Sequence, residues 1–307
     1  MTRGTVLGVL LGIGALSMAT AGFQAPQQTG PTPDALKATV IQNVKDNLYI
    51  ITGSAPAPRE TFSGGNTAVF VTATGVVVVD TKLAGWGQPI LDRIRTVTDK
   101  PVTTIINTHT HGDHTGSNEF FGTTIDSVVQ EHTKANMARM PAFSGDKAQF
   151  LPKRTFKDKM SLLSGKDQID LYYFGPAHTS GDAWVVFPAL RVVHVGDLFA
   201  WKDLPLADLN NGGSVVGFPE TLSKGLAAIT NVDTVVGGHQ LPLTPKDLQE
   251  YADFNRDFVA WARSQMKEGK TVDQAVADYK TPAKYRGYAD PQAMRLKANV
   301  QAAYDGQ

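Results

Sequence analysis

The chain has 307 residues, of which 42% are hydrophobic, and its 29 basic side chains balance its 29 acidic ones. Such a composition is typical of a globular protein with a large core, and the neutral balance excludes the basic excess of a nucleic-acid-binding surface. No cysteine is present, so neither a disulfide nor a thiolate metal ligand can form.

The N-terminus has the layout of a secretory signal peptide. Arg3 precedes an apolar run over 6–18, and Ala19 and Ala21 fit a small-x-small cleavage site. The run is shorter than the roughly 20 residues that a membrane-spanning helix needs. We therefore expect residues 1–21 to be a signal peptide and the mature protein to be periplasmic or secreted, without a stable membrane anchor. An uncleaved anchor is the alternative.

The elements that follow are predicted from apolar patterns and turn residues. Residues 22–38, rich in Pro and Gln, predict a flexible leader. Apolar runs and alternation predict strands within 40–53, 66–80, 102–108, 122–130, 168–174, 183–187, 190–195 and 234–236. Helical spacing of apolar residues predicts helices at 86–98, at 219–229 and over most of the C-terminal end. Residues 54–65 and 137–159 are predicted to be loops. This order predicts a single α/β domain, residues 39–307, with two sheets and helices packed outside them.

One short stretch concentrates imidazole groups. The segment "NTHTHGDHTGSNEFF", residues 107–121, directly follows a predicted strand. Alternate residues of an extended chain point the same way, so His109 and His111 can reach one ion. Asp113 and His114 leave the following turn in another direction, which suits a second ion. Because a single catalytic ion needs about three protein ligands and an open position, this stretch requires ligands from elsewhere.

Three later strand ends supply them. His178, Asp197 and His239 each lie at or just beyond the end of a predicted apolar strand. An unpaired carboxylate at the end of a buried strand is costly, and a metal ion explains Asp197. His194 lies inside a predicted strand and is expected to be structural, and His132 is expected at the exposed start of a helix.

Further polar residues have more than one interpretation. Asp80 ends a run of valines and is either a helix cap or a carboxylate that orients a ligand histidine. The loops 54–65 and 137–159, the latter a candidate lid, and the segment 201–218 are expected to face substrate. Within the last of these, Lys202 or Asn211 is expected to contact a substrate carboxylate or oxyanion.

Taken together, "HTHGDH", "GPAHTSGD", "HVGD" and "GGH" resemble the metallo-β-lactamase superfamily, in the family's order from about Val40 to His239. The resemblance implies an αββα sandwich with two mixed sheets and two metal ions at one edge. It implies that Asp197 bridges the two ions. It assigns three ligands to each ion: His109, His111 and His178 to the first, and Asp113, His114 and His239 to the second.

Asp197 is also where the chain departs from the best-known β-lactamases of the family, which carry a cysteine or no ligand there. A bridging aspartate is more similar to the glyoxalase II, lactonase and wider hydrolase branches. The resemblance therefore favours hydrolysis of a carbonyl-type bond in a small molecule: an ester, thioester, lactone or amide. A true β-lactamase is the alternative.

The expected chemistry is that of metal-activated water. Nitrogen and oxygen ligands suit two zinc ions best, although iron or manganese also fits. Metal coordination lowers the pKa of water towards 7, which makes a metal-bound hydroxide available as nucleophile, and Asp113 is expected to orient it or accept its proton. Two further alternatives are a mononuclear iron persulfide dioxygenase-like oxidoreductase and a non-enzymatic ligand-binding protein. The complete second ligand set argues against both.

Overall fold

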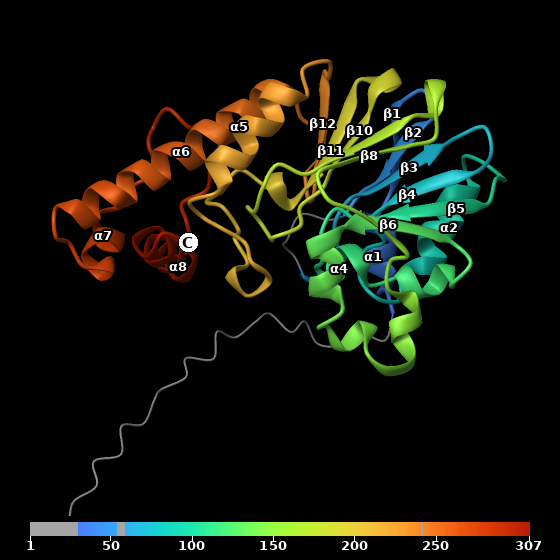
Figure 1. Cartoon of the computed structure of the whole chain (residues 1–307), viewed down its shortest axis with the longest axis horizontal. Helices are drawn as coiled ribbons and strands as arrows, with labels where there is room; N and C mark the ends of the chain where they lie inside the picture. Colours follow the sequence, from blue (N-terminus) through green and yellow to red (C-terminus); the bar gives the residue numbers. More distant parts are fainter. Residues whose placement is uncertain (1–29, 54–58, 241) are drawn as a thin grey trace, which may run out of the picture.

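A computed structural model describes residues 30–53, 59–240 and 242–307. The predicted signal peptide, the first part of the predicted leader and residues 54–58 of the first predicted loop lie outside these ranges. Two sheets face each other, with helices on the outer side of each (Figure 1).

The first sheet has seven strands in sequence order, antiparallel from β1 to β4 and parallel from β4 to β7. Its fourth strand consists of four buried valines, which is the composition of a strand covered on both faces. The strands are β1 (Ile41–Lys45), β2 (Leu48–Ile51), β3 (Thr67–Val71), β4 (Val76–Val79), β5 (Val102–Ile106), β6 (Asp126–Gln130) and β7 (Arg154–Phe156).

The second sheet has five strands in the order β12-β11-β10-β9-β8. The β11 and β12 strands are parallel, and the other neighbours are antiparallel. The strands are β8 (Lys159–Leu162), β9 (Ile169–Tyr172), β10 (Trp184–Phe187), β11 (Val192–Gly196) and β12 (Thr234–Gly237).

The helices cover the outer faces of the two sheets. In Figure 1, α1, α2 and α4 lie beside the first sheet, α5 and α6 lie on the side of the second, and α7 and α8 extend beyond them. A capping box between Thr244 and Asp247 starts the long α6. The helices are α1 (Pro33–Ala38), α2 (Gly87–Arg95), α3 (Gly112–Thr115), α4 (Glu131–Met137), α5 (Phe218–Ala228), α6 (Pro245–Lys267), α7 (Val272–Asp278) and α8 (Ala293–Asp305).

Strand alternation divides the core into layers. Val77 and Val79 point between the sheets, whereas Val76 and Val78 pack towards α2 on the outer face. Between the sheets, the rings of Phe70 and Phe187 meet edge to face with their centroids 5.0 Å apart. The two sheets are therefore joined by one continuous apolar layer, and each presents its strand ends at fixed positions.

Most predicted elements are confirmed, and two predictions need correction. The flexible leader predicted for 22–38 is wrong at its end, because α1 forms there, capped by Thr32. Arg93 of α2 holds that helix by donating to the carbonyls of Leu36 at 2.7 Å and Thr39 at 2.8 Å. The loop predicted for 137–159 is wrong in part, because it contains β7 and the start of β8. Both strands are too short for their alternation to stand out.

Within the described ranges, no helix is both long and apolar enough to cross a membrane.

Candidate metal centre

The candidate metal centre lies where the carboxyl ends of four strands meet. The pairs β4–β5 and β11–β12 are each parallel, so their carboxyl ends share an edge. Backbone hydrogen bonds join the two sheets at this edge: Ala183 donates to Thr108 at 2.8 Å, and Asn66 donates to Gly238 at 2.6 Å. The predicted ligands leave the sheets here, together with His178 from the connection between β9 and β10.

His109, His111 and His178 form one group, with one ligand atom of each within 4.8 Å of the others. His111 Nε2 donates to the carboxylate of Asp208 at 2.7 Å, and His178 Nδ1 donates to the carbonyl of Leu206. The nitrogens that remain, His111 Nδ1 and His178 Nε2, face each other 2.9 Å apart. Two bare imidazole nitrogens at this separation repel each other unless a cation lies between them.

Asp113, His114 and His239 form a second group with the same mutual proximity. His114 Nδ1 donates to Asp80 at 2.7 Å, which turns Nε2 towards the other members of the group. That nitrogen lies 3.4 Å from His239 Nε2, which in turn lies 3.4 Å from Asp113 Oδ2. The structure thus places two of the four predicted ligands of the 107–121 stretch in each group, as expected from the sequence, and a third group, His109, His114 and Asp197, links the two.

Asp197 lies between the two groups. One carboxylate oxygen is 3.3 Å from His114 Nε2, and the other is 3.3 Å from His239 Nε2 and 3.7 Å from His178 Nε2. The side chain is buried, and it enters from the turn directly after β11. Its carboxylate therefore reaches a histidine of each group, which is the placement that a bridging ligand needs.

Charge accumulates in this buried space. Burial opposes protonation of His114, but the carboxylates of Asp197, Asp113 and Asp80 together raise its pKa well above the usual value. Burial likewise raises the pKa of Asp197, yet His239 and His114 outweigh it and hold that pKa well below its usual range. Three carboxylates around two imidazoles leave an excess of negative charge that a divalent cation neutralises.

Two of the three histidines in the first group also have the protonation state that suits a metal, whereas in His111 the effect of burial is outweighed by Asp208 and Asp113, which raise its pKa. Burial, followed by the neighbouring His114, lowers the pKa of His109, and burial, followed by His111, lowers the pKa of His178 to about 4. Both rings are therefore neutral at pH 7, the form that coordinates metal. Among the described residues, the buried Nε2 of His109 has no hydrogen-bond partner. The donor set of nitrogen and oxygen fits zinc-type divalent ions.

Two glycines make room for the ligands. A Cβ on Gly65 would lie 2.1 Å from the ring of His114, and one on Gly238 would lie 1.8 Å from a carboxylate oxygen of Asp197. The fully buried Lys82 donates to the carbonyl of Gly65 at 2.7 Å and so holds that backbone against His114. A side chain at either glycine would displace a predicted ligand.

Asp80 makes the contacts of an orienting carboxylate and not those of a helix cap. It accepts from the backbone N and the hydroxyl of Thr108, both at 2.8 Å, in addition to His114. The next helix, α2, has Trp86 at its cap position. Asp80 therefore couples the strand end of β4 to two residues of the 107–121 stretch.

The sequence did not reveal Asp208, the carboxylate that holds His111. Its other oxygen accepts from the backbone N of Asn210 and Asn211, so the side chain also builds the turn that carries it. Burial raises its pKa, but the hydrogen bonds from His111 and Asn211 lower it well below the usual range. An aspartate before two asparagines signals a turn, but nothing in that pattern connects it with a histidine 97 residues away.

We expect Asp208→Ala to weaken metal binding by about 10- to 100-fold, because the ring of His111 loses the partner that fixes its tautomer and orientation. Competition for Zn²⁺ with a chromophoric chelator measures this. Asp146→Ala, at an exposed carboxylate, is the matched control. Unchanged Zn²⁺ affinity in Asp208→Ala contradicts the assignment.

The two residues predicted to bind substrate have partners within the protein. Lys202 Nζ lies 3.3 Å from Asp247 and 3.4 Å from Glu250, both on α6. Asn211 donates to Asp208 at 2.6 Å and thus supports His111 indirectly. Substrate binding by Lys202 or Asn211 stays a prediction.

Two half-buried rings flank His239. The centroid of Phe62 lies 5.7 Å from the imidazole, and that of Trp201 lies 5.6 Å from it. Phe218, the first residue of α5, is fully buried in the core. The second group therefore has apolar walls.

The remaining histidines fall where the sequence predicts. His132 starts α4 with a 51% exposed side chain. His194 is buried within β11, where it donates to the carbonyl of Asn66 at 3.3 Å and accepts from the backbone N of Gly196 at 3.1 Å. His194 is thus part of the packing between the sheets.

His194 predicts a pH effect on stability. An unfolded histidine titrates near 6.5, and burial lowers the pKa of His194 in the folded protein. The unfolded chain therefore binds more protons below pH 6.5, so the free energy of unfolding falls as the pH falls through that value. Between pH 7 and pH 5, we expect the free energy of unfolding of His194→Gln, measured by urea titration, to fall by about 1 kcal/mol less than that of the unmodified protein. His132→Gln is the control, and parallel curves for His194→Gln contradict the prediction.

The pattern of residues matches a known family. A model of the metallo-beta-lactamase superfamily matches residues 61–239, more than half of the chain. The chain belongs to the metallo-beta-lactamase superfamily. The match spans all seven predicted ligands, and the two mixed sheets with outer helices are the fold of this superfamily.

Curated relatives and solved structures agree with this assignment. The chain is 29% identical to Metallo-beta-lactamase type 2 of Elizabethkingia meningoseptica over 210 residues, 65% of this chain and 78% of that protein. It is 29% identical to 2,4-dinitroanisole O-demethylase subunit alpha of a Nocardioides strain over 130 residues, 40% of this chain and 38% of that protein. A metallo-beta-lactamase from Pontibacter korlensis shares the fold with a TM-score of 0.61 at 20% identity, over 71% of this chain and 99% of that one.

Proposed function

We propose that this protein is an exported, zinc-dependent β-lactamase that opens the amide bond of β-lactam rings. Membership of the superfamily and the paired His/Asp groups identify a metal-dependent hydrolase. The similarity to Metallo-beta-lactamase type 2 carries the substrate class, because it extends over 78% of that protein. The match to the O-demethylase subunit covers 38% of its length and supports a substrate assignment less well.

The chain's residues supply the sites for two ions. His109, His111 and His178 would hold the first, Asp113, His114 and His239 the second, and Asp197 both. Divalent ions lower the pKa of bound water from about 15.7 to about 7 and polarise a carbonyl oxygen.

Other side chains orient the ligands and shape the surroundings. Asp80 and Asp208 fix which nitrogen of His114 and His111 is bare. Asp113, whose side chain is 23% exposed, reaches towards solvent and is suited to orient the attacking water or accept its proton. The rings of Phe62 and Trp201 beside His239 suit an apolar substituent on the substrate.

A specific observation favours a second candidate, hydrolysis of another carbonyl-type bond such as an ester, thioester or lactone. The chain has no cysteine, and Asp197 stands where the best-known β-lactamases carry a cysteine or no ligand. A carboxylate shared by both groups would place the two ions within reach of one nucleophile. Such an arrangement suits the hydrolysis of any activated carbonyl, not of β-lactams alone.

Metal removal and a substrate panel test the proposal. We expect two equivalents of Zn²⁺ by mass spectrometry and turnover of nitrocefin. A chelator should abolish more than about 95% of that turnover, and added Zn²⁺ should restore it, because metal-activated water is the proposed nucleophile. The panel adds lactones, thioesters and phosphodiesters. Turnover of lactones or thioesters at a much higher kcat/KM than nitrocefin would replace the β-lactam assignment by the second candidate. Dominant phosphodiesterase activity would overturn both.

Export is tested separately. The layout of residues 1–21 supports it. Fractionation of expressing cells should find a protein beginning after Ala21 in the periplasm or medium, and full-length protein retained in the cytoplasm would refute this.

A further inference from the structure

The segment 201–217 connects the turn after β11 to α5 and carries the acceptors that hold two histidines of the first group, His111 and His178. The carbonyl of Leu206 accepts from His178, and the carboxylate of Asp208 accepts from His111. The regular structure within it is the short 3₁₀ turn Leu209–Asn211. Backbone bonds tie its middle to the loop of His178, because Asp208 N donates to the carbonyl of His178 and Ser214 N to that of Ala177, both at 2.8 Å. The position of its first part depends on what it packs against.

The C-terminal end of the chain supplies these partners through backbone contacts. The backbone N of Ala289 donates to Lys202 at 3.0 Å, and the amide of Asn299 on α8 donates to the carbonyl of Pro205 at 2.8 Å. Pro205 directly precedes Leu206, so the bond from Asn299 fixes the peptide next to the one that holds His178.

Arg295 on α8 adds a charged contact. It donates to the buried carboxylate of Asp203 at 2.7 Å, and its guanidinium lies 5.2 Å from the centre of the Trp201 ring. That ring is the one that flanks His239. Arg295 therefore contacts two residues of the 201–217 segment, one of which touches the second group of predicted ligands.

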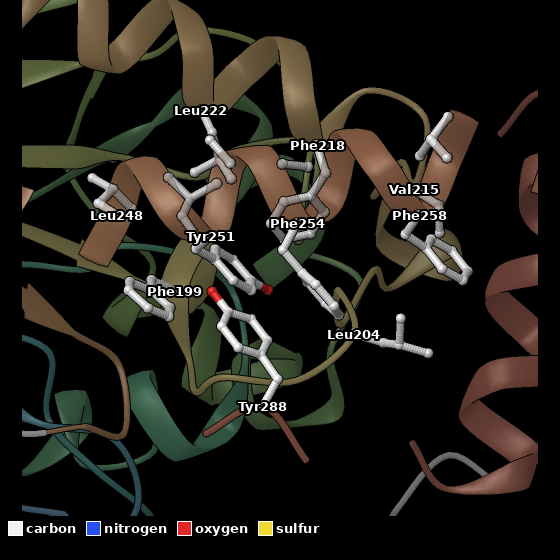
Figure 2. Packing of buried hydrophobic residues seen from close by; sticks show 14 of the residues in the cluster. Phe199, Leu204, Val215, Phe218, Leu222, Leu248, Tyr251, Phe254, Phe258 and Tyr288 are labelled. Atoms are coloured by element: carbon white, nitrogen blue, oxygen red, sulfur yellow. The ribbon is translucent and has the colours of Figure 1, made fainter. Parts of the chain in front are cut away.

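An apolar cluster joins the same partners. Leu204 and Val215 of the segment belong to one buried cluster with Phe254 and Phe258 of α6 and with Tyr288 (Figure 2). Figure 2 shows Leu204 near the ring of Phe254, with Tyr288 in the same cluster. At the far end of the segment, the backbone N of Val216 donates to the carbonyl of Gln307 at 3.0 Å.

We propose that α8 supports the metal centre through Arg295 and Asn299, positioning residues that set the Leu206 carbonyl and the Asp208 carboxylate against His178 and His111. The inference rests on the metal binding in the proposed function. These residues lie outside the 61–239 family match, so here a C-terminal addition supports ligands of the conserved fold.

A purely structural role makes a different prediction. If α8 served stability alone, its variants would unfold at lower temperature but bind metal normally while folded. If α8 positions the histidines, the folded variants bind metal more weakly and with altered ligand geometry. The affinity and the spectrum of the bound metal therefore distinguish the two roles.

The experiment uses the full chain, with Zn²⁺ affinity measured by chelator competition and ligand geometry by the visible spectrum of bound Co²⁺. We expect Arg295→Met and Asn299→Ala each to weaken one of the two Zn²⁺ sites, that of His109, His111 and His178, by about tenfold and to shift the Co²⁺ bands. Arg295→Lys should recover part of the loss, because it keeps a cation for Asp203. Lys297→Met is the matched control: Lys297 lies on α8 too, but pairs at the surface with Asp273.

Each outcome decides the proposal. Zn²⁺ affinity and Co²⁺ spectra equal to those of the unmodified protein overturn it, whatever happens to thermal stability. If Arg295→Met does not fold, Asn299→Ala, which removes one neutral hydrogen bond, decides alone. An unmodified protein that binds no Zn²⁺ refutes this inference and the proposed function together. Zn²⁺ binding with the expected variant effects but without β-lactam turnover refutes only the substrate assignment.

Discussion

Replacing Asp197 by alanine is expected to lower the bound Zn²⁺ from two equivalents to one or none and to reduce kcat/KM by about 10³-fold or more. Changes to residues that merely orient ligands already cost about 10- to 100-fold, and Asp197 contacts His114, His178 and His239 itself. Its removal also deprives His114 of one of the buried carboxylates that raise its pKa against the effect of burial. Zn²⁺ content by mass spectrometry and nitrocefin kinetics measure both effects.

Two further variants define the cause. Asp197→Asn keeps the volume of the side chain but removes its charge, so metal loss in this variant assigns the effect to the carboxylate. Asp233→Ala removes a carboxylate with a 44% exposed side chain that pairs with Lys45 and Arg191, and it should leave metal content and kinetics unchanged. Full turnover by a metal-depleted Asp197→Ala protein would exclude the metal-centred mechanism.

Replacing Asp80 by alanine is expected to lower the free energy of unfolding by about 3 kcal/mol and to weaken the second metal site. The side chain is fully buried and accepts three hydrogen bonds, from two donors on Thr108 and from His114. Its loss leaves buried donors unpaired, each at a cost of about 1–3 kcal/mol. Alanine also tolerates the left-handed backbone of this residue, with φ of 65°, less well than aspartate. Urea unfolding with and without Zn²⁺ measures both effects.

Asp80→Asn separates the carboxylate from the backbone, because asparagine tolerates φ of 65° well. Its amide group can donate to Nδ1 of His114, and the ring would then carry its proton on Nε2, the nitrogen meant for the metal. We therefore expect Asn to preserve more stability than Ala but to lose Zn²⁺ affinity about 10- to 100-fold. Asp92→Ala, at a surface carboxylate on α2, is the control. Normal Zn²⁺ affinity in Asp80→Asn contradicts the orienting role.

The strands and helices were predictable where the signal is local and long enough. Four valines in a row predict the buried strand β4, and periodic apolar residues predict α2. Both patterns depend only on which face of its own strand or helix each residue occupies. The edge strand β7, with three residues and an exposed start, carries no such pattern. Similarly, α1 forms inside a Pro- and Gln-rich stretch, because Arg93 of another helix holds its carbonyls.

The substrate was less predictable than the site. The aspartate at position 197 favours other hydrolase branches, whereas the similarity to Metallo-beta-lactamase type 2 supports the β-lactam alternative better. One ligand controls the charge of the metal centre but not the shape of the walls around it. Phe62 and Trp201 come from separate loops, and only the fold brings both to His239.

The sequence by itself determined the type of chemistry and most of the donor set. The spacing of His109, His111, Asp113 and His114 divides them between two directions, because alternation and a turn are local properties of the backbone. The absence of cysteine restricts every metal ligand to nitrogen or oxygen.

The tertiary structure decided which atoms of those residues are free to bind. The tautomers of His111 and His178 follow from the Asp208 carboxylate and the Leu206 carbonyl, and the neighbouring Pro205 carbonyl accepts from Asn299 of α8, a helix that no metal motif contains. Such contacts join residues 28 to 97 positions apart, where no sequence period exists to announce them. Residues 107–121 hold four of the seven predicted ligands, but Asp80 and Asp208, which orient two of them, come from elsewhere in the chain.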